Sequence, residues 1–180
     1  MSSATFTIRP ATRADIAILE ALVERSIRGL ADGHYDPHQI DNSLRYLYGI
    51  DSQLVDDGTY MVVERDGEVV ACGGWSWRRT PFGGDAVHDV RDAAYRMPGV
   101  DAAVIRAFFV DPHWTRQGIG RMILDACEQG ARAGGFDRYE LTSTAMAVAF
   151  YAACGYRETE PVDIALPNGT VLPHVQMIKP

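Results

Sequence analysis

A short segment rich in glycine and arginine, DPHWTRQGIGRMIL at residues 111–124, has the residue types that bind an anion. It follows the apolar run AAVIRAFFV and precedes a stretch with apolar residues at helical spacing, so it joins a predicted strand to a predicted helix. The first amides of a helix lack partners within the helix, and the helix dipole adds partial positive charge there. Gly118 and Gly120 let these amides converge on phosphate oxygens, and Arg116 and Arg121 add formal charge. The pattern is consistent with an anion site and equally with a tight turn that packs the helix on the strand.

Two familiar phosphate-binding motifs fit this corner less well. A Walker loop ends in Gly-Lys-Ser or Gly-Lys-Thr, whereas Gly120 is followed by Arg121 and Met122. A dinucleotide fingerprint gains support from Glu140, which lies at the interval of a ribose-binding acid, but its third glycine would fall at Ile123. A nicotinamide-binding fold also needs more strands and helices than remain after this point, so it is kept only as an alternative.

Two tryptophans and a histidine pair are further candidates for chemistry. Trp75 and Trp77 alternate along a predicted strand and so share one face, just before a long polar stretch at residues 78–101. They are expected either to pack in the core or to form a wall of a substrate site. The segment HYDPH places His34 and His38 close together, but its proline breaks any helical face that would align them, so no metal site is predicted.

The elements that position these residues follow from hydrophobic periodicity and turn signals. A capping box at Thr12 and Asp15 opens a first helix, and Asp36 with Pro37 opens a second. Tight hairpins are predicted at Asp66-Gly67 and Asn168-Gly169. The full order, β-α-α-β-β-β-α-β-α-β-β, predicts an α/β domain with an antiparallel meander first and a parallel crossover later.

Composition limits the class of protein. The 180 residues fit one domain spanning 1–180, with 17 basic and 24 acidic residues for a net charge of −7. This balance argues against a nucleic-acid binder, whose affinity depends on neutralising phosphates. The three cysteines form no CxxC pair, no apolar run approaches a bilayer span, and the N-terminus lacks the build of a signal peptide. A cytoplasmic protein without membrane partners is therefore expected.

The glycine corner and a second segment together resemble the GNAT superfamily of N-acetyltransferases. FFVDPHWTRQGIGRMIL matches the family's strand, its Gln/Arg-x-x-Gly-x-Gly/Ala loop and the following helix. AVAFYAACGY matches its small-residue helix with an aromatic-Tyr pair before Gly-aromatic. The resemblance implies a mixed, mostly antiparallel sheet of about seven strands, with helices on both faces and a splayed central strand pair, so the fold class is α/β of the α+β type.

The resemblance also implies a role for each matching residue, with acetyl-CoA as co-substrate and no metal. Tyr151 would lie beside the thioester sulfur and protonate the departing thiolate, and a backbone N–H near Val110 would stabilise the oxyanion. In this family the loop at Tyr35 borders the acceptor pocket, so Tyr35, Trp75 and Trp77 are the tentative substrate residues. The residues expected to bind the cofactor are Phe109, Val110, Thr115, Arg116, Gln117, Gly118, Ile119, Gly120, Arg121 and Thr144.

The sequence departs from the family pattern at several positions. Thr115 stands where the motif has Gln or Arg, and Thr144 where many relatives have an Asn that touches the pantetheine arm. Several relatives carry a glutamate on the strand before the loop, where this chain has only Arg106 as a charged residue. Candidates for a base acting through water are scattered elsewhere, and none is selected among His34, Asp85, His88, Asp89 and His113.

These observations predict a coenzyme-dependent enzyme. The expected reaction is direct transfer of the acetyl group of acetyl-CoA to a primary amine of a small molecule, through a ternary complex. The alternatives are a coenzyme A-binding module without catalysis and a nicotinamide enzyme. A homodimer is possible through the C-terminal hairpin, whose strands are expected to be apolar. The acceptor is not identified.

Overall fold

A seven-stranded sheet with the order β1-β2-β3-β4-β5-β7-β6 organises residues 5–180, the part of the chain that the computed structural model describes. Every neighbouring pair is antiparallel except β4 and β5. The mixed, mostly antiparallel sheet predicted above is confirmed, and it excludes the nicotinamide alternative, which requires a mainly parallel sheet. The strands are β1 (Thr7–Pro10), β2 (Tyr60–Arg65), β3 (Glu68–Ser76), β4 (Ala103–Val110), β5 (Tyr139–Thr144), β6 (Arg157–Ala165) and β7 (Val171–Lys179).

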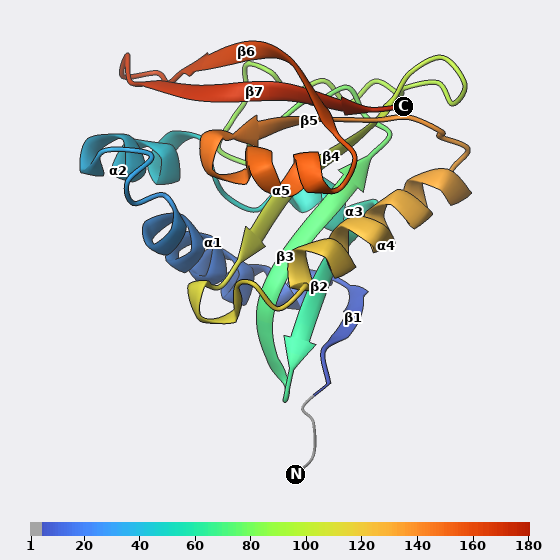
Figure 1. Ribbon diagram of the computed structural model, residues 1–180, viewed down its shortest axis with the longest axis horizontal. Coiled ribbons are helices and arrows are strands. Elements are labelled where there is room, and N and C mark those ends of the chain that lie inside the picture. Colours follow the sequence, from blue (N-terminus) through green and yellow to red (C-terminus); the bar gives the residue numbers. More distant parts are fainter. Residues whose placement is uncertain (1–4) are drawn as a thin grey trace.

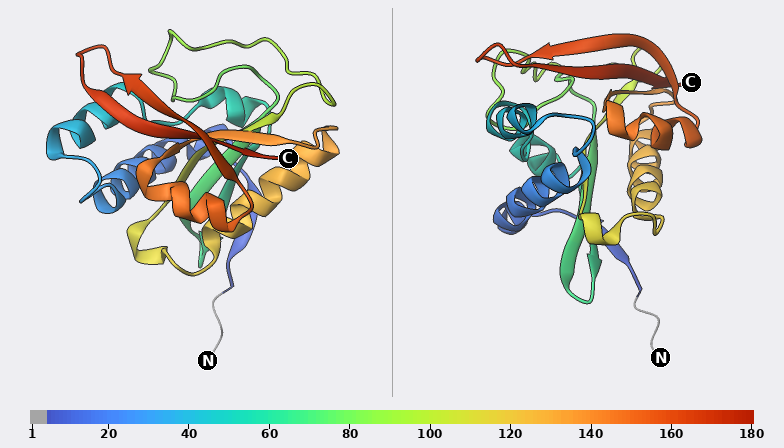
Figure 2. Two further views of the ribbon diagram at one scale, coloured as in Figure 1. Left: turned by 45° about the horizontal axis from the view of Figure 1, so that its top comes forward. Right: turned by 60° about the vertical axis from the view of Figure 1, so that its left-hand side comes forward.

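The helices cover both faces of this sheet. α1 (Ile16–Leu30) and α2 (Pro37–Tyr46) lie on one face, and α4 (Ile119–Ala133) and α5 (Val148–Ala153) lie on the other (Figures 1 and 2). Each face has its own core cluster: α1 residues such as Leu19 and Leu22 belong to one, and α4 residues such as Ile123 and Leu124 to the other. The sheet therefore separates two packed layers, and a ligand at the edge of β4 can be reached from both.

The starts of α1 and α2 have the predicted capping chemistry. Thr12 and Asp15 form a capping box around the 3-10 turn Arg13–Asp15, which leads directly into α1. Asp36 Oδ1 accepts from the Gln39 amide at 2.7 Å, and Gln39 Oε1 accepts from the Asp36 amide at 3.0 Å. Both predicted β-hairpins are present as well.

The two central strands β4 and β5 diverge. They pair in parallel only at Ala103 with Tyr139 and at Val104 with Glu140. On the other side of β4, the register with β3 shifts by one residue between Cys72 and Gly74, and Ala107 adopts a left-handed φ of 59°. Such a bulge bends the strand away from its neighbour. The predicted splay is confirmed, and it leaves one main-chain edge of β4 without a strand partner.

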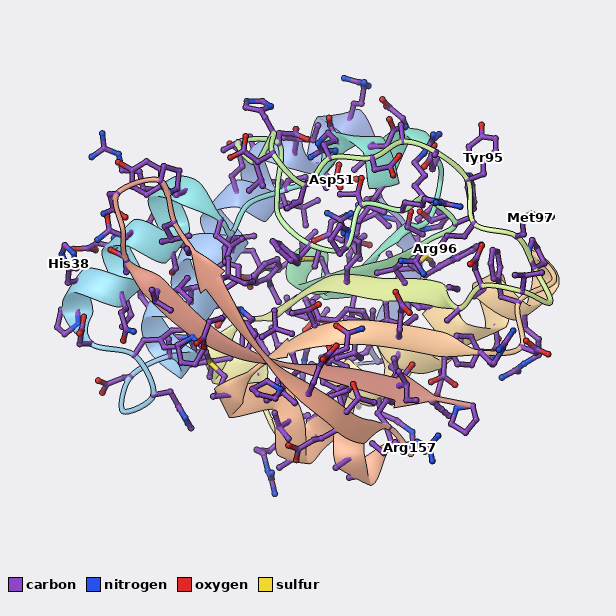
Figure 3. All side chains as sticks on the ribbon, turned by 90° about the horizontal axis from the view of Figure 1, so that it is seen from above. His38, Asp51, Tyr95, Arg96, Met97 and Arg157 are labelled. Atoms are coloured by element: carbon purple, nitrogen blue, oxygen red, sulfur yellow. The ribbon has the colours of Figure 1, made fainter. Side chains whose placement is uncertain are left out.

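The β6–β7 hairpin lies across the end of the splayed pair, with its tip against α2 (Figure 3). Side-chain hydrogen bonds fix this contact: Gln39 Nε2 donates to the Val171 carbonyl at 2.9 Å, Asn168 Nδ2 donates to Asn42 Oδ1 at 2.7 Å, and Thr170 Oγ1 lies 3.4 Å from His38 Nε2. The edge strand β6 was expected to be apolar, but it is mostly exposed and carries charged residues and Pro161. These features oppose pairing with a further strand, so they give no support to a dimer formed along this edge.

The structure also bears on the remaining expectations from the sequence. The short helix α3 (Ser52–Asp56) was not predicted, and the long stretch 78–101 contains no helix but returns on itself through a bridge between Arg78 and Tyr95. No helix within residues 5–180 is long and apolar enough to cross a membrane. The first residues of the stretch considered for a signal peptide lie outside the described residues.

Candidate active site

A cavity of about 700 Å³ occupies the gap opened by the splay. Its walls come from α1, the open edge of β4, the glycine corner, the end of β5, the segment before α5, β7 and the long stretch after β3. Elements from both ends of the sequence thus meet at one site. At one end the walls carry Arg116 and Arg121, and at the other they carry tyrosine, histidine and aliphatic side chains.

The open edge of β4 presents the main chain of Val110 to this cavity. The Asp111 amide donates to the Val70 carbonyl of β3 at 2.9 Å, and hydrogen bonding alternates along an antiparallel pair. The polar groups of Phe109 therefore face β3, and those of Val110 face the gap, so only Val110 of these two predicted residues offers main-chain groups at the open edge. The Val110 amide is engaged by Ser26 Oγ of α1 at 3.2 Å.

The glycine corner has the geometry of an anion cradle. After the 3-10 turn Pro112–Trp114, Arg116 and Gly118 both adopt left-handed conformations, with φ of 63° and 80°. Gly118 is the N-cap of α4, and its carbonyl accepts the first helical hydrogen bond from the Met122 amide. The amides of Ile119, Gly120 and Arg121 precede that bond, so they remain available to an anion.

The predicted cofactor residues gather at this corner with one exception. Gln117 does not line the cavity, whereas the other predicted residues do. Thr115, the departure from the family motif, donates its hydroxyl to the Pro112 carbonyl at 3.1 Å and so stabilises the turn. At Gly120 an added Cβ would lie 3.2 Å from the Phe150 ring, which explains why a small residue is needed where α5 approaches the corner.

Tyr151 is buried beside β4 with its hydroxyl at the cavity. Its ring packs edge-on against Phe108, Phe150 and Tyr156, with centroids 5.0 to 6.1 Å away. Burial raises the pKa of the phenol well above its ordinary value, so the hydroxyl keeps its proton at neutral pH. The hydroxyl forms no hydrogen bond within residues 5–180. A protonated donor free of other partners is suited to a developing thiolate.

A hydrogen-bonded tyrosine and histidine line the opposite part of the cavity, and sequence reasoning missed both. Tyr48 Oη lies 2.8 Å from His174 Nε2, and His174 Nδ1 lies 2.9 Å from the Leu172 carbonyl oxygen. The two residues come from the segment after α2 and from β7, separated by 126 positions in the sequence. No local pattern could have paired them, because the sheet topology alone brings them together.

Arg106 is the only charged residue of β4, and it holds the wall of the cavity. Its guanidinium pairs with Asp51 at 2.8 Å and donates to the Thr80 carbonyl at 3.1 Å. Both charged side chains are buried, with 4% and 2% of their surface exposed. Arg91 of the long stretch pairs with the same carboxylate at 3.0 Å. This cluster fixes the stretch after β3 against the sheet.

The three residues expected to contact the substrate, Tyr35, Trp75 and Trp77, do not line the cavity. Trp75 is buried against α4, where an added Cβ at Gly130 would lie 2.6 Å from its indole nitrogen. Trp77 stacks edge-on against Trp75 at 5.2 Å, and neither lines the cavity. Tyr35 is buried beneath β7 and donates to the Pro173 carbonyl at 3.1 Å. None of the three residues therefore forms a wall of this cavity.

Of the five scattered base candidates, only His34 lines the cavity. His113 lies beside Asp111 in the turn before the corner, Asp85 accepts from the Ser52 amide at 2.9 Å, and His88 and Asp89 are exposed. Within the described residues, no group of three His, Cys, Asp or Glu is placed to hold a metal ion.

Comparisons with known proteins agree with this geometry. The model of the acetyltransferase (GNAT) family matches residues 20–156. A search of curated protein sequences returned no match. Many solved structures share the fold. One is a GCN5-related N-acetyltransferase from Rhodopseudomonas palustris, with a TM-score of 0.72 and 21% identity over 99% of this chain and 98% of that one.

Two further similar structures carry more specific names. The PaiA N-acetyltransferase from Thermoplasma acidophilum, solved in complex with coenzyme A, has a TM-score of 0.66 and 13% identity over 97% of this chain and 98% of that one. A ribosomal-protein-alanine N-acetyltransferase from Brucella melitensis has a TM-score of 0.61 and 20% identity over 96% and 98%. At these identities the likeness establishes the fold alone.

Proposed function

Because the chain belongs to the acetyltransferase (GNAT) family, we propose that it transfers the acetyl group of acetyl-CoA directly to the primary amine of a small molecule. The observation that carries the proposal is one cavity whose lining extends from the anion cradle at Gly118 to Tyr48 and His174. The bound coenzyme A in a similar structure supports the donor. Both substrates can then occupy one space, as direct transfer requires.

The cradle and the open strand edge fit the donor. The amides of Ile119, Gly120 and Arg121, with the guanidinium groups beside them, would hold the diphosphate. The main chain at Val110 would pair with the amide-bearing pantetheine arm in the manner of an added strand. Coenzyme A supplies an activated thioester when bound. Thr144 also lines this part of the cavity and offers a hydroxyl in place of the usual asparagine.

The end of the cavity at Tyr48 and His174 leaves room for a small acceptor. The whole cavity of about 700 Å³ lies within the range of about 300–1,000 Å³ typical of small-molecule sites, and the acceptor would share it with the coenzyme. Arg106 and Asp51 fix the long stretch over this end, which leaves Leu47, Phe82 and Gly83 as part of its wall. No acidic side chain within residues 5–180 lines the cavity, so a second ammonium on the acceptor would have no carboxylate partner there. An acceptor with one amine is therefore favoured.

The chain's own groups supply the transfer chemistry. As the amine nitrogen bonds to the carbonyl carbon, charge develops on the carbonyl oxygen, and a main-chain amide at the open edge is placed to stabilise it. The Val110 amide donates to Ser26 Oγ at 3.2 Å. It can stabilise the oxyanion only when this hydrogen bond breaks. As the C–S bond breaks, Tyr151 donates its proton to the sulfur.

Thiol release from acetyl-CoA in the presence of a panel of amines tests the proposal. The panel should include amino acids, amino sugars, aromatic amines, simple alkylamines and short peptides with free N-termini, with the acetylated product identified by mass spectrometry. We expect one acetylated amine for each thiol released. Binding of acetyl-CoA by calorimetry without release across the panel would overturn catalysis and indicate a coenzyme-binding module. Release only with peptide N-termini would overturn the small-molecule acceptor, because similar structures include a protein-modifying enzyme.

A further inference from the structure

We propose that Tyr48 takes a proton from the acceptor amine while passing its own proton to His174. The inference rests on the proposed N-acetyltransferase function and assigns the base that the β4 strand lacks. Both side chains line the cavity, and their hydrogen bond of 2.8 Å is already formed. Tyr48 would be the catalytic residue, since it faces the acceptor, and His174 would act through it.

The hydrogen bonds of His174 define its tautomer. The Leu172 carbonyl, 2.9 Å from Nδ1, can only accept, so Nδ1 carries the hydrogen. Nε2 of the neutral ring is then a lone-pair acceptor, and Tyr48 must be the donor in their contact. The phenol oxygen keeps its own lone pairs for another donor. An amine in the cavity can therefore give a proton to Tyr48 Oη.

The pair lies on the side of β4 opposite Tyr151. The Tyr48 ring meets Phe109 at 6.2 Å, and the Tyr151 ring meets Phe108 at 6.1 Å. Phe109 belongs to the core cluster beneath α1 and α2, whereas Phe108 packs against the cluster beneath α4. A thioester at the open edge of β4 would thus lie between a proton donor on one side and a proton acceptor on the other. The proton acceptor would then be close to the attacking nitrogen, and the proton donor would be close to the departing sulfur.

The surroundings of His174 favour a neutral ring. Burial lowers the pKa of His174 below its ordinary value, with Leu172 and the carboxylate of Asp163 on β6 opposing the change. On the neighbouring strand β5, the residue opposite His174 is Thr144, which does not titrate. Burial also raises the pKa of Tyr48 well above its ordinary value, and Tyr35 beside it acts in the same direction. Tyr48 therefore stays protonated and can transfer a proton only by receiving another.

The proton balance of the reaction is complete with these groups. An alkylammonium first loses one proton through Tyr48 to His174 Nε2, and the imidazolium releases it to solvent. The neutral nitrogen then forms the C–N bond as the C–S bond breaks. The nitrogen, made acidic by this new bond, loses its second proton to solvent, while Tyr151 protonates the sulfur. Solvent returns a proton to the Tyr151 phenolate. The net products are an amide, a thiol and one proton in solution.

The variant His174→Gln tests the relay, because a glutamine carbonyl can accept from Tyr48 but has no basic nitrogen. Two acceptors should be compared: the alkylamine of the panel with the highest turnover, and hydroxylamine, which is unprotonated at neutral pH. We expect kcat/KM for the alkylamine to fall at least about 100-fold, the lower range for general base catalysis, and that for hydroxylamine to fall no more than about threefold. The inflection that protonation of His174 adds to the acid side of the wild-type pH profile of kcat/KM should also disappear.

Two further variants keep the result interpretable. His38→Gln makes the same change at an exposed histidine near Thr170 of the same hairpin, and it should leave both acceptors unaffected. Tyr48→Phe retains the ring and should reproduce the selective loss even if His174→Gln does not fold. Equal losses with both acceptors, or an unchanged alkylamine rate, would overturn the relay alone. Failure of the wild-type protein to acetylate any amine would overturn the relay and the proposed function together.

Discussion

The two ends of the cavity are built in different ways. The proposed coenzyme end is made by consecutive residues, from Val110 through the turn to Arg121, and the groups proposed to bind the coenzyme there are largely main-chain amides. The acceptor end is assembled from Tyr48, Arg106 and His174, which come from three separate parts of the chain and act through side chains. One end depends on local backbone conformation, and the other on the packing of the whole sheet.

The two ends of the cavity therefore differ in the substitutions that they tolerate. Main-chain amides at a helix start are retained under most substitutions that preserve φ and ψ, so the coenzyme end is sensitive mainly at its glycines. The acceptor end depends on buried polar groups, each of which loses a partner when the other is removed. We therefore expect substitutions at the two ends to affect different measurements.

The largest effect should come from breaking the buried ion pair at the acceptor end. Arg106→Ala would leave Asp51 buried with only Arg91 as a charged partner, and loss of one member of a buried pair costs about 3–5 kcal/mol. Urea unfolding would measure this loss. As a control, Arg13→Ala removes the exposed pair with Asp56 and should not change the urea midpoint. Equal effects of the two variants would show that burial does not matter here.

The second effect concerns the coenzyme end. Gly118→Ala places a Cβ on a residue with φ of 80° and shifts the first amides of α4, which should weaken acetyl-CoA binding by about 10- to 100-fold if one charge-assisted hydrogen bond is lost. Calorimetry would measure the affinity. Gly67→Ala, at φ of 83° and likewise free of contacts within 4 Å, imposes similar strain at a remote turn. Comparable loss of affinity in both variants would contradict the cradle.

The third effect separates chemistry from binding. Tyr151→Phe removes the proton donor but keeps the ring against Phe108, so turnover should fall at least about tenfold while acetyl-CoA affinity stays nearly unchanged. Steady-state rates and calorimetry on the same protein would test this. An unaltered turnover number would remove Tyr151 from the mechanism.

The smallest effect is expected at Trp77, which does not line the cavity. Trp77→Phe preserves an aromatic contact with Trp75 and does not touch the cavity, so the ratio of kcat/KM for two acceptors should change by less than about twofold. Competition between two amines in one assay would give this ratio directly. A clear change in preference would return the tryptophans to the acceptor site.

The contrast between the two ends also explains what the sequence could predict. Gly118, Arg121 and the helix that follows are contiguous, so spacing and helix chemistry were sufficient to predict the corner. Tyr48 and His174 lie 126 positions apart, and only the strand order brings them together. The shared face of Trp75 and Trp77 followed from strand alternation, but β3 is buried on both faces, and alternation does not say which face meets the cavity. The five-residue α3 is too short to show a helical period.

The most direct test of the account is a crystal structure of the protein with acetyl-CoA. We expect the diphosphate oxygens to lie about 3.0 Å from the amides that open α4, with the thioester between Tyr151 and Tyr48. Density for the diphosphate away from Gly118, or a thioester that approaches neither phenol, would contradict it.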